Sequence, residues 1–194
     1  DMFDAQILAQ NVIEGANSFP LLAVPFFMLA GEIMNAGGLS KRIVLFAMSM
    51  VGHVRGGLGY VAIMAAVIMA ALSGSAVADA AALSALLLPM MVHAGHDKAR
   101  SAGLLASASI IAPIIPPSIG FVIFGVAANV SISKLFLAGI APGVLLGVAL
   151  CFTWWWVARR EAVATPPRKS AAEVLDALRN AVFALGLPVI VVVG

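Results

Sequence analysis

The fold of this chain is decided by residues 72–83, which read LSGSAVADAAAL. This run places two hydroxyls, a glycine and a carboxylate inside an otherwise apolar stretch that extends from residue 58 to residue 91. Asp79 is the only charged side chain between residues 56 and 89. A carboxylate at bilayer depth costs roughly 2.5–3.5 kcal/mol or more, so it needs a partner or a watery cavity and is a candidate for function.

The same stretch is too long for one membrane crossing. It has 34 residues, whereas an α-helix crosses a hydrocarbon core of about 30 Å with about 20 residues. We expect two half-helices that meet at Ser73, Gly74 and Ser75, with the tip buried in protein rather than in lipid. Secondary transporters build ion and substrate sites from such broken helices.

Composition indicates the class of protein. The chain is 62% hydrophobic and 10% charged, with a mean hydropathy of +1.08, whereas soluble domains have about 25% charged residues. This predicts an all-α polytopic membrane protein. The basic residues form no stripe, which argues against nucleic-acid binding, and the single Cys151 excludes an intrachain disulfide. Because the chain starts at Asp1 and ends within an apolar run, we expect an internal fragment of a longer permease.

A second interruption lies in residues 101–130 and consists of Pro113, Pro116, Pro117, Ser118 and Gly120. Three prolines within five residues cannot continue a helix. Since proline lacks an N–H, we expect the carbonyls of residues 109–112 to lose their helical partners. The sequence therefore predicts a broken helix directly after the hairpin.

The two interruptions supply groups that can bind both a cation and an anion. Unwound carbonyls and hydroxyl oxygens suit a hard cation such as Na⁺, and the half-helix N-termini offer N–H groups to an anion. We predict Na⁺ ligands at Ser73, Ser75 and Ser118. The full set of predicted ion- or substrate-binding residues is Ser73, Gly74, Ser75, Asp79, Pro113, Pro116, Pro117, Ser118 and Gly120. No catalytic residue and no cofactor other than the coupling ion is expected.

Structural alternatives remain open for each feature. The Ser-Gly-Ser break could be a packing hinge between close helices, and the proline loop could be a simple kink. Asp79 could bond to a neighbouring helix instead of an ion. Glu32 fits a cap or interfacial hydrogen bond better than a proton relay. His93 and His96 fit a solvated loop better than a metal site, because no third ligand is in view.

The organisation along the chain follows from these breaks. We expect an interfacial helix over 1–17, two transmembrane helices over 18–57, a re-entrant hairpin over 58–92, a broken transmembrane helix over 101–131, a transmembrane helix over 135–158, a cytoplasmic loop and surface helix over 159–182, and the truncated start of a further span over 183–194. With a re-entrant hairpin, eight of the eleven Lys and Arg residues share one face, which makes that face cytoplasmic.

Five segments resemble the large membrane subunit of the tripartite ATP-independent periplasmic (TRAP) transporters. They are residues 18–34, the hairpin at 73–83, IIPPSIG at 114–120, ANVSIS at 128–133 and LFLAGIAPG at 135–143. The resemblance runs from Ser18 to Arg160. Residues 76–79 read AVAD where many family members read GPAT, and this variant is similar to the branch associated with sugar acids.

The resemblance implies an elevator-type fold built from inverted repeats, of which this chain holds one. It also implies a Na⁺-coupled permease for small organic anions, either dicarboxylates or sugar acids, in the bacterial inner membrane. Its implied partners are a small four-helix membrane subunit and a periplasmic substrate-binding protein. A Na⁺-coupled anion carrier without a binding-protein partner is the alternative within transporters.

Other classes fit the sequence less well. An intramembrane protease would need a Gly-x-Ser-Gly serine with a histidine at membrane depth, or paired aspartates, and neither pattern occurs. A structural anchor would have no reason to break two successive helices with polar tips.

Overall fold

The computed structural model describes residues 5–160 and 167–193, the side chains of residues 5, 16 and 183–193 excepted. All regular structure in that part of the chain is helical, which confirms the expected all-α class. The elements are α1 (Ala5–Ala16), η1 (Phe19–Leu22), α2 (Ala23–Ala36), α3 (Leu39–Val51), α4 (Gly57–Ser73), α5 (Ala76–His93), α6 (Lys98–Ser109), α7 (Ile119–Ala127), α8 (Ile132–Ala158) and α9 (Ala171–Val193).

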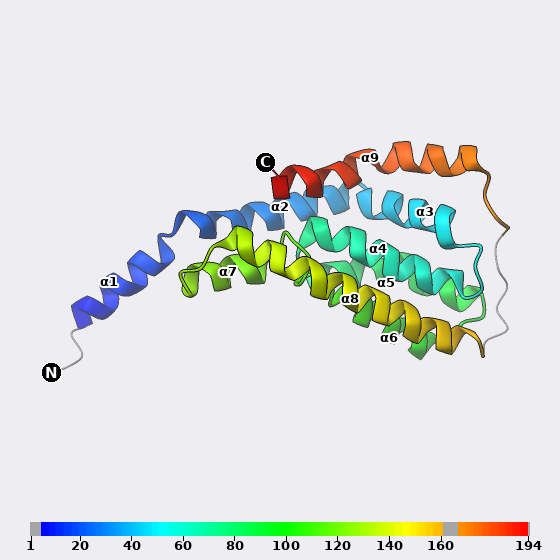
Figure 1. Cartoon of the computed structure of the whole chain (residues 1–194), viewed down its shortest axis with the longest axis horizontal. Helices are drawn as coiled ribbons and strands as arrows, with labels where there is room; N and C mark the ends of the chain where they lie inside the picture. The colour runs from blue at the N-terminus through cyan, green and yellow to red at the C-terminus, as the bar shows by residue number, and fades with distance from the viewer. Residues whose placement is uncertain (1–4, 161–166, 194) are drawn as a thin grey trace.

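Helix α4 lies at the centre of the bundle and packs mainly against α3, α5, α6 and α8 (Figure 1). Its residues Val61, Ala62, Ala65 and Ala66 are at most 1% exposed. Alanine and other small residues let helix backbones approach closely in membrane proteins, where packing rather than the hydrophobic effect joins helices. The core is therefore tight around the helix that carries the first half of the hairpin.

Trp154 of α8 fixes the start of α4. Its indole Nε1 donates to the carbonyl oxygen of Gly56 at 2.8 Å, and its ring fills the space that a side chain at Gly59 would need. His96, which follows α5, lies against the same ring with 5.4 Å between centroids. Because His96 is 4% exposed, the expected solvated loop is wrong at this residue, although His93 is exposed as expected.

Among the described residues, three helices are long and apolar enough to cross a membrane by length and composition. They are Phe19–Ala36, Ala76–His93 and Ile132–Ala158. Helix α8 exposes Leu137, Val144, Leu145, Val148 and Phe152, a face that fits lipid or another apolar helix. Helix α3 has only 13 residues, or about 20 Å, which is shorter than a hydrocarbon core of about 30 Å.

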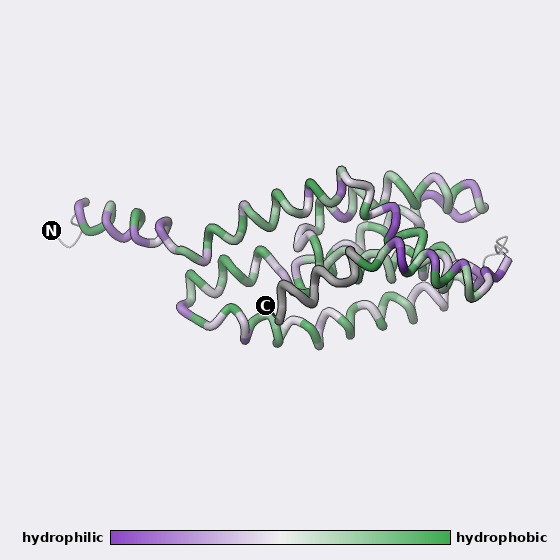
Figure 2. The backbone as a smooth tube through the Cα atoms, turned by 90° about the horizontal axis from the view of Figure 1, so that it is seen from above, coloured by the Kyte–Doolittle hydropathy of each residue, from purple (hydrophilic) through white to green (hydrophobic). Residues whose placement is uncertain are grey.

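The two ends of the molecule are more polar than its middle. Helix α1 extends away from the bundle (Figure 1), and Figure 2 shows hydrophilic residues along it and at the opposite end. Helix α9 packs against α3 and runs continuously through the residues predicted as a surface helix followed by a further span. Residues 1–4, 161–166 and 194, which belong to the predicted terminal segments and cytoplasmic loop, lie outside the described residues.

Both interruptions that the sequence predicts are present in the structure, where each one separates two helices. Helix α4 ends at Ser73 and α5 begins at Ala76, and the two helices pack against each other as a hairpin. Helix α6 ends at Ser109 and α7 begins at Ile119, with turns between them. Re-entry of the hairpin into a bilayer stays a prediction.

Candidate functional site

The two chain breaks touch through Gly74. This residue ends α4 with φ of +59°, a conformation that L side chains rarely adopt. A Cβ placed on it would lie 2.5 Å from the carbonyl oxygen of Pro117 and 3.4 Å from the backbone nitrogen of Ile119. The hairpin tip therefore lies backbone to backbone on the proline loop, and only glycine fits there.

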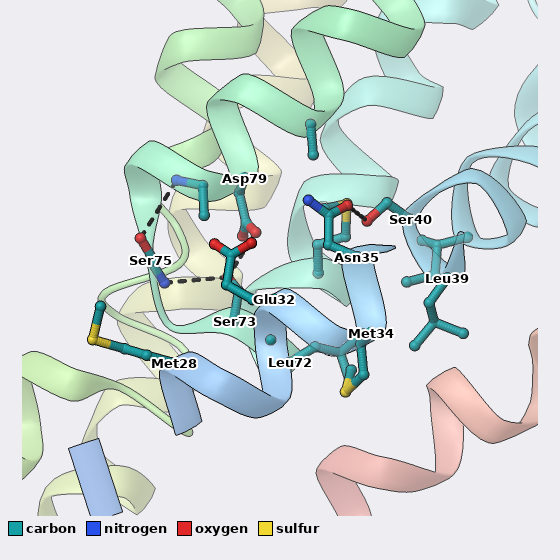
Figure 3. A pocket seen from close by; sticks show the side chains of 15 residues that line it. Met28, Glu32, Met34, Asn35, Leu39, Ser40, Leu72, Ser73, Ser75 and Asp79 are labelled. Atoms are coloured by element: carbon teal, nitrogen blue, oxygen red, sulfur yellow. Dashed lines mark hydrogen bonds between the residues drawn. The ribbon is translucent and has the colours of Figure 1, made fainter. Parts of the chain in front are cut away.

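Hydroxyl groups hold the hairpin tip together. The Ser73 hydroxyl donates to Oδ1 of Asp79 at 2.6 Å and accepts from the backbone N–H of Ser75 at 3.2 Å (Figure 3). The Ser75 hydroxyl accepts from the N–H of Ala78 at 3.4 Å, so Ser75 is the N-cap of α5. These bonds stabilise the first turn of α5 against the last turn of α4.

Asp79 is only partly satisfied by this network. The residue is 1% exposed, and its Oδ2 has no hydrogen-bond partner among the described residues. Of the two alternatives left open for Asp79, the bond to a neighbouring helix accounts for one oxygen only. The second oxygen is buried, and burying a charged atom without a partner is strongly unfavourable.

The proline break is organised by Ser118. Its hydroxyl donates to the carbonyl oxygen of Pro113 at 2.7 Å and accepts from the N–H of Phe121 at 3.3 Å, which makes it the N-cap of α7. Ser118 is fully buried. Two of its three hydrogen-bonding positions are therefore used inside the loop, and one lone pair remains for a ligand.

The expectation that the carbonyls of residues 109–112 lose their helical partners is wrong for Ile111, which keeps the N–H four residues on, whereas Ser109 lacks this donor because residue 113 is proline. The Ile111 carbonyl accepts from the N–H groups of Ile114 and Ile115, and the Ser109 carbonyl accepts from Ala112. The chain tightens into turns with three-residue spacing before the later prolines, and these turns supply donors that an α-helical ladder would have lost.

A small cavity opens beside the hairpin tip, between α2, α3 and α5 (Figure 3). Its volume is about 60 Å³. Its polar lining residues are Glu32, Asn35, Ser40, Ser73, Ser75 and Asp79. Asn35 Oδ1 accepts from the Ser40 hydroxyl at 2.7 Å. The lining contains two carboxylates and no Lys or Arg among the described residues, so the cavity favours a cation over an anion.

The comparison with known proteins assigns the chain to a family. The model of the DctM component of the tripartite ATP-independent periplasmic transporters matches residues 1–194. The chain belongs to this family. It is 59% identical over its whole length to the 2,3-diketo-L-gulonate TRAP transporter large permease protein of Escherichia coli K12.

More distant TRAP relatives differ in their named substrates. The chain is 42% identical over 96% of its length to the sialic acid TRAP transporter large permease protein of Vibrio cholerae. It is 41% identical over 96% of its length to the C4-dicarboxylate TRAP transporter large permease protein of Pseudomonas aeruginosa. These relatives are permeases and not enzymes. The chain spans about half the length of each, covering 46%, 44% and 44% of them respectively.

The predicted site residues of this TRAP permease chain fall into two groups. Ser73, Ser75 and Asp79 line the cavity, whereas no predicted residue of the proline break is among its described lining residues. Pro117 instead contacts Gly74 and borders a separate apolar groove with Phe26 and Leu72. The hairpin tip thus borders the cavity with its two carboxylates on one side and contacts the backbone of the proline loop on the other.

Sequence analysis missed Glu32 and Asn35 as lining residues of the cavity. Glu32, for which the sequence favours a cap or an interfacial hydrogen bond, lies in the apolar span Phe19–Ala36, where a carboxylate is a signal of function. No group of three His, Cys, Asp or Glu side chains suited to a metal ion occurs in the described part of the chain.

Proposed function

We propose that this chain is part of the membrane permease of a Na⁺-coupled secondary transporter that imports small organic anions. A periplasmic binding protein delivers the anion, and a small four-helix membrane subunit completes the complex in the bacterial inner membrane. Membership of the DctM family supports this proposal. The contact of the two chain breaks at Gly74 and Pro117 is the structural observation that carries it.

Na⁺ is bound where the breaks meet. Oxygen ligands suit a hard cation, and this region combines unwound carbonyls with the hydroxyls of Ser73, Ser75 and Ser118. Each hydroxyl already makes hydrogen bonds within the protein, so its position is fixed before the ion arrives. The ion adds a ligand set that spans both breaks and stabilises one relative position of the hairpin and the broken helix.

The organic anion is bound at the N-termini of α5 and α7. Both half-helices begin directly after a break, and helix N-termini offer N–H groups and a positive dipole end to carboxylates. Pro113, Pro116 and Gly120 shape the backbone around the second of these N-termini. A bound Na⁺ close by adds positive charge, which couples binding of the anion to binding of the cation.

The substrate is a sugar acid in this proposal. The relative that is 59% identical over the whole chain is named for 2,3-diketo-L-gulonate, whereas the relative named for C4-dicarboxylates is 41% identical. A Na⁺-coupled anion carrier that works without a binding protein is the alternative.

Uptake in proteoliposomes tests the proposal. The full-length permease is reconstituted with the small membrane subunit, and radiolabelled 2,3-diketo-L-gulonate or a C4-dicarboxylate is supplied with or without the binding protein. We expect uptake of the sugar acid that requires both an inward Na⁺ gradient and the binding protein. Uptake without the binding protein supports the alternative, and uptake that ignores the Na⁺ gradient refutes both.

A further inference from the structure

One exposed face of α8 changes from aliphatic to aromatic to basic along its length. Leu145, Val148, Phe152, Trp155 and Arg159 follow one another at intervals of three or four residues, which places them on one side of the helix. All five are exposed, and the first three are exposed by 69%, 61% and 64%. The rings of Phe152 and Trp155 lie 5.6 Å apart between centroids. These five residues, which we call the α8 stripe, therefore form one continuous surface.

The α8 stripe matches the length and the polarity of one lipid molecule. An α-helix rises about 21 Å from Leu145 to Arg159, and one leaflet of a bilayer with its headgroups is about 20–22 Å thick. Aliphatic side chains fit the depth of the acyl chains, and tryptophan is enriched at the level of the headgroups. When the stripe is aligned with a leaflet in this way, Arg159 lies at the depth of the lipid phosphate.

The chain concentrates positive charge at the end of α8. Nη2 of Arg55, which precedes α4, donates to the carbonyl oxygen of Arg159 at 3.3 Å. Five Lys and Arg side chains and a single carboxylate, that of Asp97, belong to three described segments at this end, residues 53–57, 93–100 and 154–160. The C-terminal dipole of a helix amounts to only about half a negative charge. The end of α8 therefore attracts an anion.

Arg159 is arranged to bind a phosphate group. Its Cζ lies 3.4 Å from the centroid of the Trp155 ring, so the guanidinium stacks on the indole. Stacking uses the face of the guanidinium, whereas its N–H donors lie in its plane and point to the sides. A phosphate can accept two of these donors at once. Because Trp155 fixes the orientation of the guanidinium, the donors are in place before the ligand arrives.

We propose that the α8 stripe and the arginines at its end form a binding site for an anionic phospholipid. An acyl chain lies along Leu145, Val148 and Phe152, and the phosphodiester is bound by Arg159. Arg55 and Arg160 supply further positive charge, which favours an anionic headgroup over a zwitterionic one because the amine of a zwitterionic lipid is repelled. The bound lipid joins the end of α8 to the start of α4. This site does not depend on which ion or anion is transported.

The test uses the full-length permease with its small membrane subunit, purified in detergent. The probes are phosphatidylglycerol, phosphatidylcholine and inorganic phosphate, and the readout is thermal unfolding against probe concentration, because a ligand that binds the folded state raises its stability. The variant Arg159→Gln is compared with Arg42→Gln. Arg42 is also exposed, but it borders a groove on α3 that contains Glu173 and Asp176, so it is the matched control.

Phosphatidylglycerol should stabilise the parent complex at a lower concentration than phosphatidylcholine, and inorganic phosphate should not stabilise it, because phosphate does not cover the apolar part of the stripe. Arg159→Gln should need about fivefold more phosphatidylglycerol for the same stabilisation, the change expected for one basic residue at an anionic lipid surface. Arg42→Gln should respond as the parent does. Equal responses of the parent to both lipids, or to inorganic phosphate, overturn the site.

Arg159→Lys separates a specific site from diffuse attraction. Lysine keeps the positive charge but lacks the planar fork that stacks on Trp155 and binds a phosphate with two donors. We therefore expect Arg159→Lys to need about twofold more phosphatidylglycerol than the parent. A response identical to that of the parent would mean that only the overall charge attracts the lipid, which refutes a site built around Arg159.

An acidic segment of the small membrane subunit is the rival occupant of this surface. In that case the parent complex shows no response to phosphatidylglycerol, and Arg159→Gln loses the small subunit during size-exclusion chromatography. That pair of results would refute the lipid site. We expect instead that Arg159→Gln and the parent retain the small subunit equally and differ in their response to the anionic lipid.

Discussion

Gly74 and Pro117 lie so close that a single methyl group on Gly74 would come within 2.5 Å of the Pro117 carbonyl oxygen. They are the turning points of two successive interrupted helices, and the contact is made by backbone on both sides. Because backbone atoms cannot move aside as a flexible side chain does, the relative position of the two breaks is set within a narrow range. This rigidity suits a site in which unwound carbonyls bind an ion.

Gly74→Ala should destabilise the protein and abolish Na⁺-driven uptake. Alanine in the left-handed region costs roughly 1–2 kcal/mol, and the contact with Pro117 adds a steric penalty. Gly38→Ala is the control, since Gly38 has a similar φ of +75° but no atom within 4 Å of the added Cβ. Thermal unfolding and uptake are measured for both. Equal effects of the two variants would mean that the contact with Pro117 contributes neither to stability nor to uptake.

Ser73→Ala should lower stability more than Ser75→Ala. Ser73 donates to the buried Asp79 carboxylate, and hydrogen bonds to charged groups contribute about 1.5–3 kcal/mol. Ser75 caps α5, and loss of such a cap costs about 1 kcal/mol. Both variants should insert in the membrane and show a raised half-activating Na⁺ concentration. Sodium dependence identical to the parent in both variants would refute the assignment of these hydroxyls as ligands.

A double-mutant cycle of Ser73→Ala and Asp79→Ala isolates their interaction, because each single change removes the hydrogen bond between the two side chains. Neighbours that share a hydrogen bond show coupling energies of about 0.5–3 kcal/mol, so the double variant should be less destabilised than the sum of the single variants. The measurement is thermal unfolding of the detergent-solubilised complex. Simple additivity would contradict the 2.6 Å bond between the two side chains.

Trp154→Phe should reduce stability without changing Na⁺ activation. Phenylalanine keeps much of the ring that packs over Gly59 but removes the indole N–H that donates to Gly56. The Gly56 carbonyl keeps the backbone N–H of Gly59 as a donor, so the change removes one hydrogen bond, at about 0.5–1.5 kcal/mol. Thermal unfolding and the half-activating Na⁺ concentration are measured together. A large shift in Na⁺ activation would mean that the start of α4 is coupled to the hairpin tip.

The positions of both breaks were predictable because glycine and proline act locally. Gly74 takes a left-handed conformation at the end of α4, and the prolines stop α6 whatever surrounds them. The serine caps Ser75 and Ser118 carry a local signal of the same kind, a side-chain oxygen placed directly before a helix. Such effects depend on a few neighbouring residues, so the sequence alone displays them.

The contacts between distant residues were not predictable in this way. Nothing in the pattern around Glu32 shows that it shares a cavity with Asp79, and nothing around His96 shows that it packs on Trp154. These contacts depend on how α2 and α8 pack against the rest of the bundle. Local sequence patterns do not specify that packing. The predicted loss of helical carbonyl partners before the prolines is wrong for Ile111, because its carbonyl keeps the N–H of Ile115 as a donor.

Changing Pro116 and Pro117 together to alanine tests whether the second break is needed for transport. The change restores two N–H donors and introduces the residue with the highest helix propensity, so α7 can extend backwards toward α6. The Gly74 contact and the cap made by Ser118 would then be lost. We expect a variant that still inserts, is at least as stable as the parent, and has lost Na⁺-driven uptake.

Pro142→Ala provides the matched control for this variant. Pro142 lies within the continuous helix α8, so its replacement adds an N–H donor without closing a break, and uptake should stay near the parent value. Uptake in proteoliposomes is measured for both, with membrane insertion checked by fractionation. Near-normal uptake in the Pro116 and Pro117 double variant would mean that the break is only a kink, and that Na⁺ binds without the backbone of the proline loop.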